Sequence, residues 1–373
     1  MHNRIERVRI WLLGGASVLL IVILAFVGFA RYLSHRFLAG LPPKLGMNIK
    51  SETNGFTYSQ SLQGKTVYTL HASKEVEHTN GKIMLHDVHM VLYGKNGDRA
   101  DSITGEGFEL DQSAGIIRAM GPVHIDLQAA PPAAGGKSDV TGARILHATT
   151  SGLIYLQKLG VAATSDKIQF QLGEMAGEAR GADYSTDTGL LILHSAIKMT
   201  GIAGARPVSL VASGAVVDNR NRQVLLRHAK YISLGQIIEA DQATLHTRID
   251  GSLSRVDAQG NLRVKTQDGV LTSQRANVLL GTQSKPQSIL LTGGVIYSSD
   301  ELLRHLKGSA DQARITFDSN EQPENVVFMG EVQIVGRIRP AGSSEQWTSR
   351  DLTAGRVDAE FERSVPNKSQ LRT

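Results

Sequence analysis

The sequence predicts an elongated, modular all-β fold, and the clearest evidence is a repeated strand-turn-strand unit. Apolar and polar residues alternate through residues 276–280 and again through 289–297, and a proline-containing turn at 284–286 separates the two runs. A period of two is typical of β-strands. The same order recurs at 313–334 and occurs earlier at 243–264. We therefore expect each unit to be a pair of strands joined by a turn.

The spacing of these units predicts how they assemble. Units begin at Ala243, Ala276 and Ala313, which are 33 and 37 positions apart. Repeats of this length are typical of stacked architectures, in which one unit cannot bury its apolar face alone and its neighbours complete the core. The 38 glycines and the aromatic content of 5% agree with many short strands and frequent turns.

The composition also excludes some function classes. The chain has 373 residues, a formal net charge of +5 and no cysteine. Lysines and arginines are scattered and are not interleaved with aromatic residues, so a nucleic-acid groove is not expected. Without cysteine there is neither a disulfide framework nor a thiolate metal site.

The N-terminal segment predicts a membrane anchor. Residues 10–30 are almost continuously apolar and carry no charge, and about 20 such residues span a bilayer as a helix. Three arginines within residues 1–9 favour a cytoplasmic N-terminus. A cleaved signal peptide is the alternative, with small residues near 28–30, but the apolar run is longer than a usual signal core. Residues 31–50 are expected to be a spacer.

The exported part divides by composition. Residues 51–128 contain strand patterns and the hairpin turn Asn80-Gly81, and they predict a first β-domain. Residues 129–137, rich in proline and glycine, are the expected linker. Residues 138–338 hold the repeats, with one helix-like stretch at 302–306, and residues 339–373 form a last strand and a tail. One strand every ~8–12 residues predicts about twenty-five strands.

Motifs for catalysis or metal binding are not found. There is no nucleophile elbow, dinucleotide loop or zinc-protease motif among the 12 histidines. His86 and His89 lie in an expected strand, where a spacing of three would place the rings on opposite faces. Glu75 and Glu77 are interpreted as surface charges. We expect no enzyme activity, no catalytic residue, no metal and no cofactor.

Several segments carry a resemblance to known proteins. In the first domain these segments are 67–72, 85–88, 92–97, 103–105 and 121–125, and in the later units they are 294–295 and 330–334. The segments of the first domain resemble the LptC family, the membrane-anchored periplasmic component of lipopolysaccharide export, and the preceding apolar span fits that layout. The later segments resemble the LptA or OstA-like family of soluble bridge proteins in the same pathway.

The resemblance implies a fold and a function. The fold would be an open, twisted β-jellyroll with an apolar groove that holds the acyl chains of lipopolysaccharide or a related glycolipid. The chain would sit in the inner membrane with a single pass and its bulk in the periplasm. Its partners would be an inner-membrane ABC transporter, and jellyroll bridge and outer-membrane translocon proteins that stack on its edge strands. This chain differs from LptC in continuing into bridge-like repeats.

The alternating positions supply candidates for the groove lining and for the pairing edge. The competing interpretation is that the lining residues pack on one another as a filled core. The alternative function is therefore an envelope scaffold or sensor with a closed β-solenoid core and no lipid. The groove candidates are Val123, Ile125, Val278, Leu280, Ile289, Leu291, Val295, Ile315, Phe317, Val326, Phe328, Val332 and Ile334, and the edge candidates are Val357, Ala359 and Phe361.

Overall fold

The computed structural model describes most of the chain after residue 47. The chain forms two compact units, Met1–Lys50 and Ser51–Thr373. The predicted membrane span at 10–30 and the predicted linker at 129–137 lie outside the described residues, and no helix within the described part is long and apolar enough to cross a membrane. The described ranges are 48–62, 64–94, 100–128, 145–172, 174–203, 206–301, 304–338, 348–365 and 368–371.

The all-β prediction is confirmed. Twenty-two strands and one short 3-10 turn, η2 (Thr282–Ser284), make up the described chain. The stretch at 302–306 was expected to be helix-like, and this is wrong from Arg304 onward, where a strand begins. The strands are β1 (Ile49–Leu62), β2 (Lys65–His78), β3 (Lys82–Tyr93), β4 (Ala100–Asp111), β5 (Ile116–Ala119), β6 (Val123–Gln128), β7 (Ile145–Thr150), β8 (Ile154–Leu156), β9 (Val161–Leu172), β10 (Met175–Ser185), β11 (Leu190–Ala203), β12 (Arg206–Ala212), β13 (Gly214–Asp218), β14 (Gln223–Ser233), β15 (Gln236–Thr247), β16 (Leu253–Lys265), β17 (Val270–Leu280), β18 (Pro286–Glu301), β19 (Arg304–Phe317), β20 (Pro323–Ile338), β21 (Thr348–Val365) and β22 (Lys368–Leu371).

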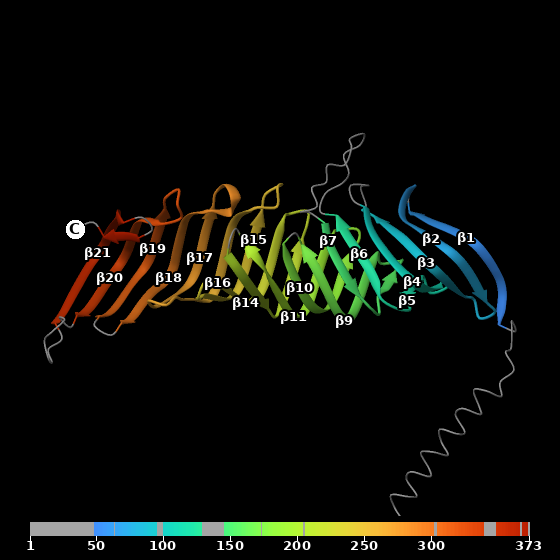
Figure 1. Ribbon diagram of the computed structural model, residues 1–373, viewed down its shortest axis with the longest axis horizontal. Coiled ribbons are helices and arrows are strands. Elements are labelled where there is room, and N and C mark those ends of the chain that lie inside the picture. The colour runs from blue at the N-terminus through green and yellow to red at the C-terminus, as the bar shows by residue number, and fades with distance from the viewer. Residues whose placement is uncertain are drawn as a thin grey trace, which may run out of the picture. The chain divides into compact units, whose positions relative to one another are not determined.

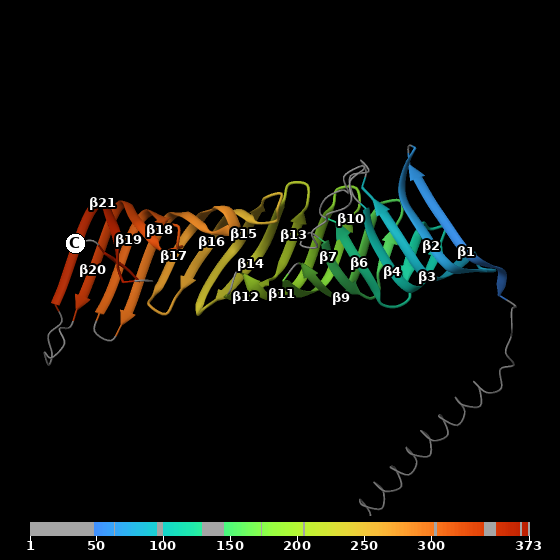
Figure 2. The same ribbon diagram turned by 45° about the horizontal axis from the view of Figure 1, so that its top comes forward.

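The strands form an antiparallel meander. Each long strand pairs with the one before it and the one after it, so the sheet grows in sequence order from β1 to β21 (Figures 1 and 2). Three of the rungs are split into two short strands: β5 with β6, β7 with β8, and β12 with β13. β6 pairs with β7, so the ladder continues across the predicted linker.

The long strands bend near their middles, where register shifts interrupt the ladders. Glycines at these bends explain the repeated Gly-x-Val pattern. Gly260, Gly293 and Gly330 have φ angles of +75°, +84° and +74°, a region that glycine adopts readily. A Cβ on Gly260 would lie 2.5 Å from the Asp241 carboxylate, and one on Gly330 would overlap that of Asp311. Backbone conformation and close packing both require glycine here.

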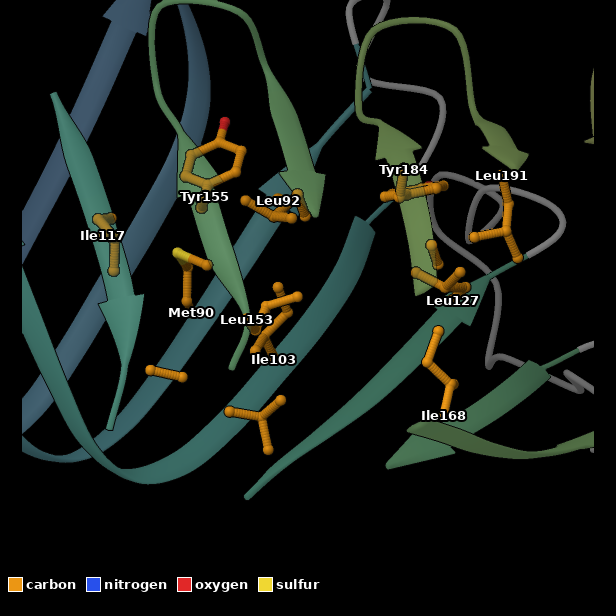
Figure 3. Packing of buried hydrophobic residues seen from close by; sticks show 14 of the residues in the cluster. Met90, Leu92, Ile103, Ile117, Leu127, Leu153, Tyr155, Ile168, Tyr184 and Leu191 are labelled. Atoms are coloured by element: carbon orange, nitrogen blue, oxygen red, sulfur yellow. The ribbon is translucent and has the colours of Figure 1, made fainter. Parts of the chain in front are cut away.

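The apolar core has two clusters. The larger is built from residues between Tyr68 and Ala229 and contains many fully buried large side chains. Figure 3 shows Met90, Leu92 and Tyr155 gathered in this cluster, from strands β3 and β8. The smaller cluster, from Ala240 to Ala313, is made largely of alanines and a few larger residues at the bends. The two parts of the sheet are therefore filled to different extents.

Candidate functional site: the inner face of the bent sheet

Directly paired residues of neighbouring strands share a face of the sheet, and this lets apolar side chains be traced from strand to strand. One such series, which we call the Ile83–Ala359 row, crosses the sheet from β3 to β21 without a polar residue other than tyrosine. Its members in order are Ile83, Leu110, Ile117, Tyr155, Ala162, Tyr184, Leu191, Val217, Val224, Leu245, Val256, Val278, Ile289, Ile315, Val326 and Ala359.

A second series, the Leu70–Leu352 row, lies on the other side of the bends and runs from β2 to β21. Glycine occupies two of its positions. Its members are Leu70, Met90, Ile103, Ile125, Ala148, Phe170, Gly177, Met199, Leu210, Tyr231, Ile238, Val264, Leu271, Tyr297, Gly308, Ile334 and Leu352.

Both rows lie on one face, which we call the inner face. In the larger cluster, Leu70 and Met90 of one row pack together with Leu110 and Ile117 of the other. In the smaller cluster, Leu271 and Ile289 pack against the same buried residues. The bend of each strand therefore brings its two halves towards each other across an apolar space.

The inner face changes from closed to open along the sheet. In the Ile83–Ala359 row, the residues from Ile83 to Leu191 are buried, and Ile117 is only 1% exposed. From Val217 to Ala359 every member is half-buried. At the far end of the other row, Leu352 is 47% exposed. The rows thus pass from buried to half-buried along the sheet, while Leu291, Val295 and Val332, nearer the bends of the second part, stay buried.

Small residues occupy the bends in the second part of the inner face. Ala258, Ala276, Ala310 and Ala313 are all buried beside the bends, where the first part has larger side chains such as Phe108. An alanine side chain fills little of the space between the two halves of a strand. The repeated alanine that marked each sequence unit is explained by this position.

The structure brings most of the predicted lining residues together. Those in β17 to β20 lie on the inner face. Val278, Ile289, Ile315 and Val326 are consecutive members of the Ile83–Ala359 row. One step nearer the bend, Leu291 pairs with Ala313, which pairs with Phe328. At the outer ends of the strands, Leu280 pairs with Pro286 and Phe317 with Pro323. The remaining candidates, Val295, Val332 and Ile334, lie beyond the bends.

Val123 and Ile125 lie elsewhere, on β6 in the closed part of the sheet. Val123 is fully buried and belongs to the larger cluster, and Ile125 packs against that cluster. For these two positions the filled-core interpretation describes the packing. Any ligand contact at Val123 would require the two halves of the sheet to separate.

The predicted edge residues lie on β21, the last long strand. Val357 pairs with Phe328 and Ala359 with Val326, so both also extend the inner face. Phe361 pairs with Leu371 of β22. Within the described residues, β22 covers only the end of β21 from Phe361 onward. Among the described strands, residues 348–359 of β21 pair with β20 alone.

The sequence interpretation found only part of the second row. Leu271, Tyr297 and Leu352 belong to the inner face but were not among the candidates. Leu271 and Leu352 are out of phase with the alternation on the other side of their bends, because the register shift changes the phase in β17 and β21. Tyr297 continues the alternation of Ile289 and Leu291 in β18.

The outer face is polar and holds cross-strand ion pairs. His246 Nε2 lies 2.8 Å from Asp257 Oδ2, Arg255 Nε lies 2.9 Å from the same oxygen, and Asn277 donates a hydrogen bond of 2.5 Å to Asp257 Oδ1. Burial raises the pKa of Asp257, but these donors outweigh it and hold the pKa below its usual range. This face therefore stabilises the ladder in a way that depends on pH.

Histidine positions differ from expectation in one place. Leu85, Val88 and Met90 of β3 are all buried, because the strand is irregular at Asp87, where φ is +50°. His86 and His89 are consequently both exposed, and the prediction that they lie on opposite faces is wrong. No group of three or more potential metal ligands occurs in the part of the chain that the structure describes.

Comparison of the chain with models of protein families gave no match, and comparison with curated proteins gave none either. The function is therefore argued from the bent sheet and its two apolar rows.

Proposed function

We propose that this protein is a membrane-anchored lipid-transfer bridge, which carries the acyl chains of lipopolysaccharide or a related glycolipid along the inner face of its sheet. The observation that supports the proposal is the pair of uninterrupted apolar rows, half-buried from β13 to β21. A filled core would bury these side chains, and a purely structural sheet has no need to leave them accessible over so many strands.

The dimensions suit an acyl chain. From β13 to β21 the Ile83–Ala359 row crosses nine strands, and at ~4.8 Å per strand spacing this is about 38 Å. One leaflet of a bilayer, half of ~30 Å, is about the length of one extended acyl chain. Exposing a chain of a dozen carbons to water costs about 10 kcal/mol, at ~0.8 kcal/mol per methylene. An accessible apolar row removes most of that cost.

The proposal extends to architecture and location. The bent meander is the open, twisted β-jellyroll that the sequence resemblance implies, and residues 10–30 are its single membrane span. The chain then lies in the periplasm, receives lipid from an inner-membrane ABC transporter and passes it towards the outer membrane. Residues 348–359 of β21 pair with β20 alone among the described strands, and in this proposal a bridge or translocon protein of the same fold adds a strand on their other side.

The closed part of the sheet has a different role in this proposal. Its buried core between Tyr68 and Ala229 gives the domain its stability. This observation favours the scaffold interpretation for the first part only. It leaves lipid contact to the strands after β12.

Site-specific photo-crosslinking tests the proposal. A photoreactive residue replaces Ile315, Phe317 or Phe328 on the inner face of the full-length chain, in cells that make lipopolysaccharide. Ile117 serves as a closed-core control. Leu279, an apolar residue 44% exposed on the outer face, controls for nonspecific lipid contact.

The expected result is lipid adducts at the three inner positions and none at Leu279 or Ile117. Equal labelling of Leu279 and Ile315 would show that lipid merely contacts exposed apolar residues. A folded protein without adducts at any inner position would favour the closed scaffold.

A further inference from the structure

The end of the inner face at β19 to β21 contains a hollow between glycines. Gly308 in β19 lies between Tyr297 and Ile334, and Gly336 in β20 lies between Leu306 and Arg350. No register shift separates these positions, so their side chains all belong to the inner face. We call this the Gly308–Gly336 trough.

Room for a Cβ at ordinary contact distance distinguishes Gly308 and Gly336 from Gly177 in the closed part of the sheet. A Cβ on Gly336 would lie 3.8 Å from the nearest atoms, and one on Gly308 would meet nothing closer than 3.8 Å. At Gly177, in the same row but in the closed part, a Cβ would lie 2.5 Å from the Phe170 ring. Close packing therefore requires glycine at 177, whereas at 308 and 336 glycine leaves an apolar surface bare.

Two arginines border the trough. Arg304 precedes Leu306 by two residues in β19, and Arg350 precedes Leu352 by two residues in β21, so both lie on the inner face. Both side chains are exposed, and neither has an ion pair with a described residue. Lys307 lies between Leu306 and Gly308 in β19 and therefore on the opposite, outer face. The inner face thus ends in two arginines beside the half-buried Leu306 and the exposed Leu352, and Glu301 of β18 is the residue paired with Arg304.

We propose that the Gly308–Gly336 trough binds an anionic lipid at the junction of acyl chain and phosphate. The first methylenes lie over the glycines between Leu306 and Leu352, and Arg304 and Arg350 bind the phosphate. A guanidinium group matches phosphate oxygens in geometry and remains charged at all physiological pH values. This inference rests on the proposed function and assigns the chemistry of the headgroup.

The test compares two lipids that differ only in the phosphate. The full-length protein in amphipol is titrated against fluorescent short-chain phosphatidic acid and against the matching diacylglycerol, and binding is followed by anisotropy. The double variant R304Q/R350Q removes the inner charges. The control K307Q/R337Q removes the same amount of charge from the outer face of the adjacent strands β19 and β20.

We expect R304Q/R350Q to weaken phosphatidic acid binding about tenfold, to the level of diacylglycerol, and to leave diacylglycerol binding unchanged. K307Q/R337Q should change neither. An equal loss in both double variants, or no loss in R304Q/R350Q, would overturn the inference. In either case normal binding of diacylglycerol would leave the proposed function standing, whereas a wild-type protein that binds neither lipid would refute both.

A filling substitution tests the hollow separately. Gly336→Leu requires no positive φ angle, and its Cβ would lie at ordinary contact distance from its neighbours. We expect it to weaken the binding of both lipids several-fold at unchanged circular dichroism and melting temperature. Unchanged binding in the folded G336L variant would show that the trough is not the site.

Discussion

Two isoleucines in one row allow the closed and open parts of the sheet to be compared with a single substitution. Ile117 and Ile315 both belong to the Ile83–Ala359 row, but Ile117 is 1% exposed and Ile315 is half-buried. Replacing each by alanine removes the same atoms. The two variants differ only in what surrounds the side chain.

The expected magnitudes follow from that surrounding. Ile117→Ala should leave a cavity in the larger cluster and lower the free energy of unfolding by about 3–4 kcal/mol, within the usual range for buried aliphatic side chains. Ile315→Ala should lower the free energy of unfolding by about 1 kcal/mol. Burial contributes ~0.8 kcal/mol per methylene, but the half-buried Ile315 has only roughly half of this contribution to lose, and its removal leaves no closed cavity. The difference is about 2 kcal/mol.

Hydrogen exchange is the suitable assay, because a long stacked sheet need not unfold in one step. Amide protection is measured in the strands that flank each site: β4 and β8 around Ile117, and β18 and β20 around Ile315. A difference of ~2 kcal/mol is about thirtyfold in local protection. Equal losses in the two variants would refute our conclusion that the second part of the inner face is open.

Three further predictions concern the bends and the outer face. Gly330→Ala should destabilise β20 by at least ~1–2 kcal/mol, because φ is positive at this position and the new Cβ would overlap Asp311. Adding Asp311→Ala should restore part of the stability measured by urea unfolding. Full additivity of the two losses would contradict the packing of Gly330 against Asp311. Asp257→Asn should lower stability by about 1–2 kcal/mol at pH 7. Since the pKa of Asp257 is lowered in the folded state, its contribution to stability is present above the unfolded pKa of ~3.9 and is lost as the pH falls through the folded pKa. The plots of stability against pH for the variant and the wild type should therefore converge at low pH. Parallel plots would refute this prediction. Ala313→Leu, at a position 1% exposed, should cost ~1–3 kcal/mol by overpacking, measured as a lower melting temperature; an unchanged value would show a void at the bend.

Much of the architecture could be predicted from local patterns. Alternation through 276–280 and 289–297 predicted strands that the structure contains as parts of β17 and β18. The turns between them were visible as proline and glycine because turn conformations depend on single residues. Local chemistry also revealed the 33- and 37-residue spacing, which the structure reproduces at the bends as Asp241, Gln274 and Asp311, each beneath a glycine of the next strand.

Other features needed the register. Alternation around Ala276 identified Val278 as facing one side, but it did not show that Val278 adjoins Ile289 and Ile315 in a row, which depends on strand pairing. The bend of β17 resets the phase, so Leu271 beyond it could not be assigned to the face of Val278 from spacing alone.

The sequence by itself determined the all-β class, the strand pairs and the apolar pattern, because these follow from the period of the chain and its turn residues. Only the tertiary structure decided which apolar residues are enclosed. Val123 and Val326 were both predicted to line the groove, yet one is fully buried and the other half-buried. The physical reason is that burial depends on what lies across the bend of the sheet, and the side chains that meet there come from strands far apart in the chain.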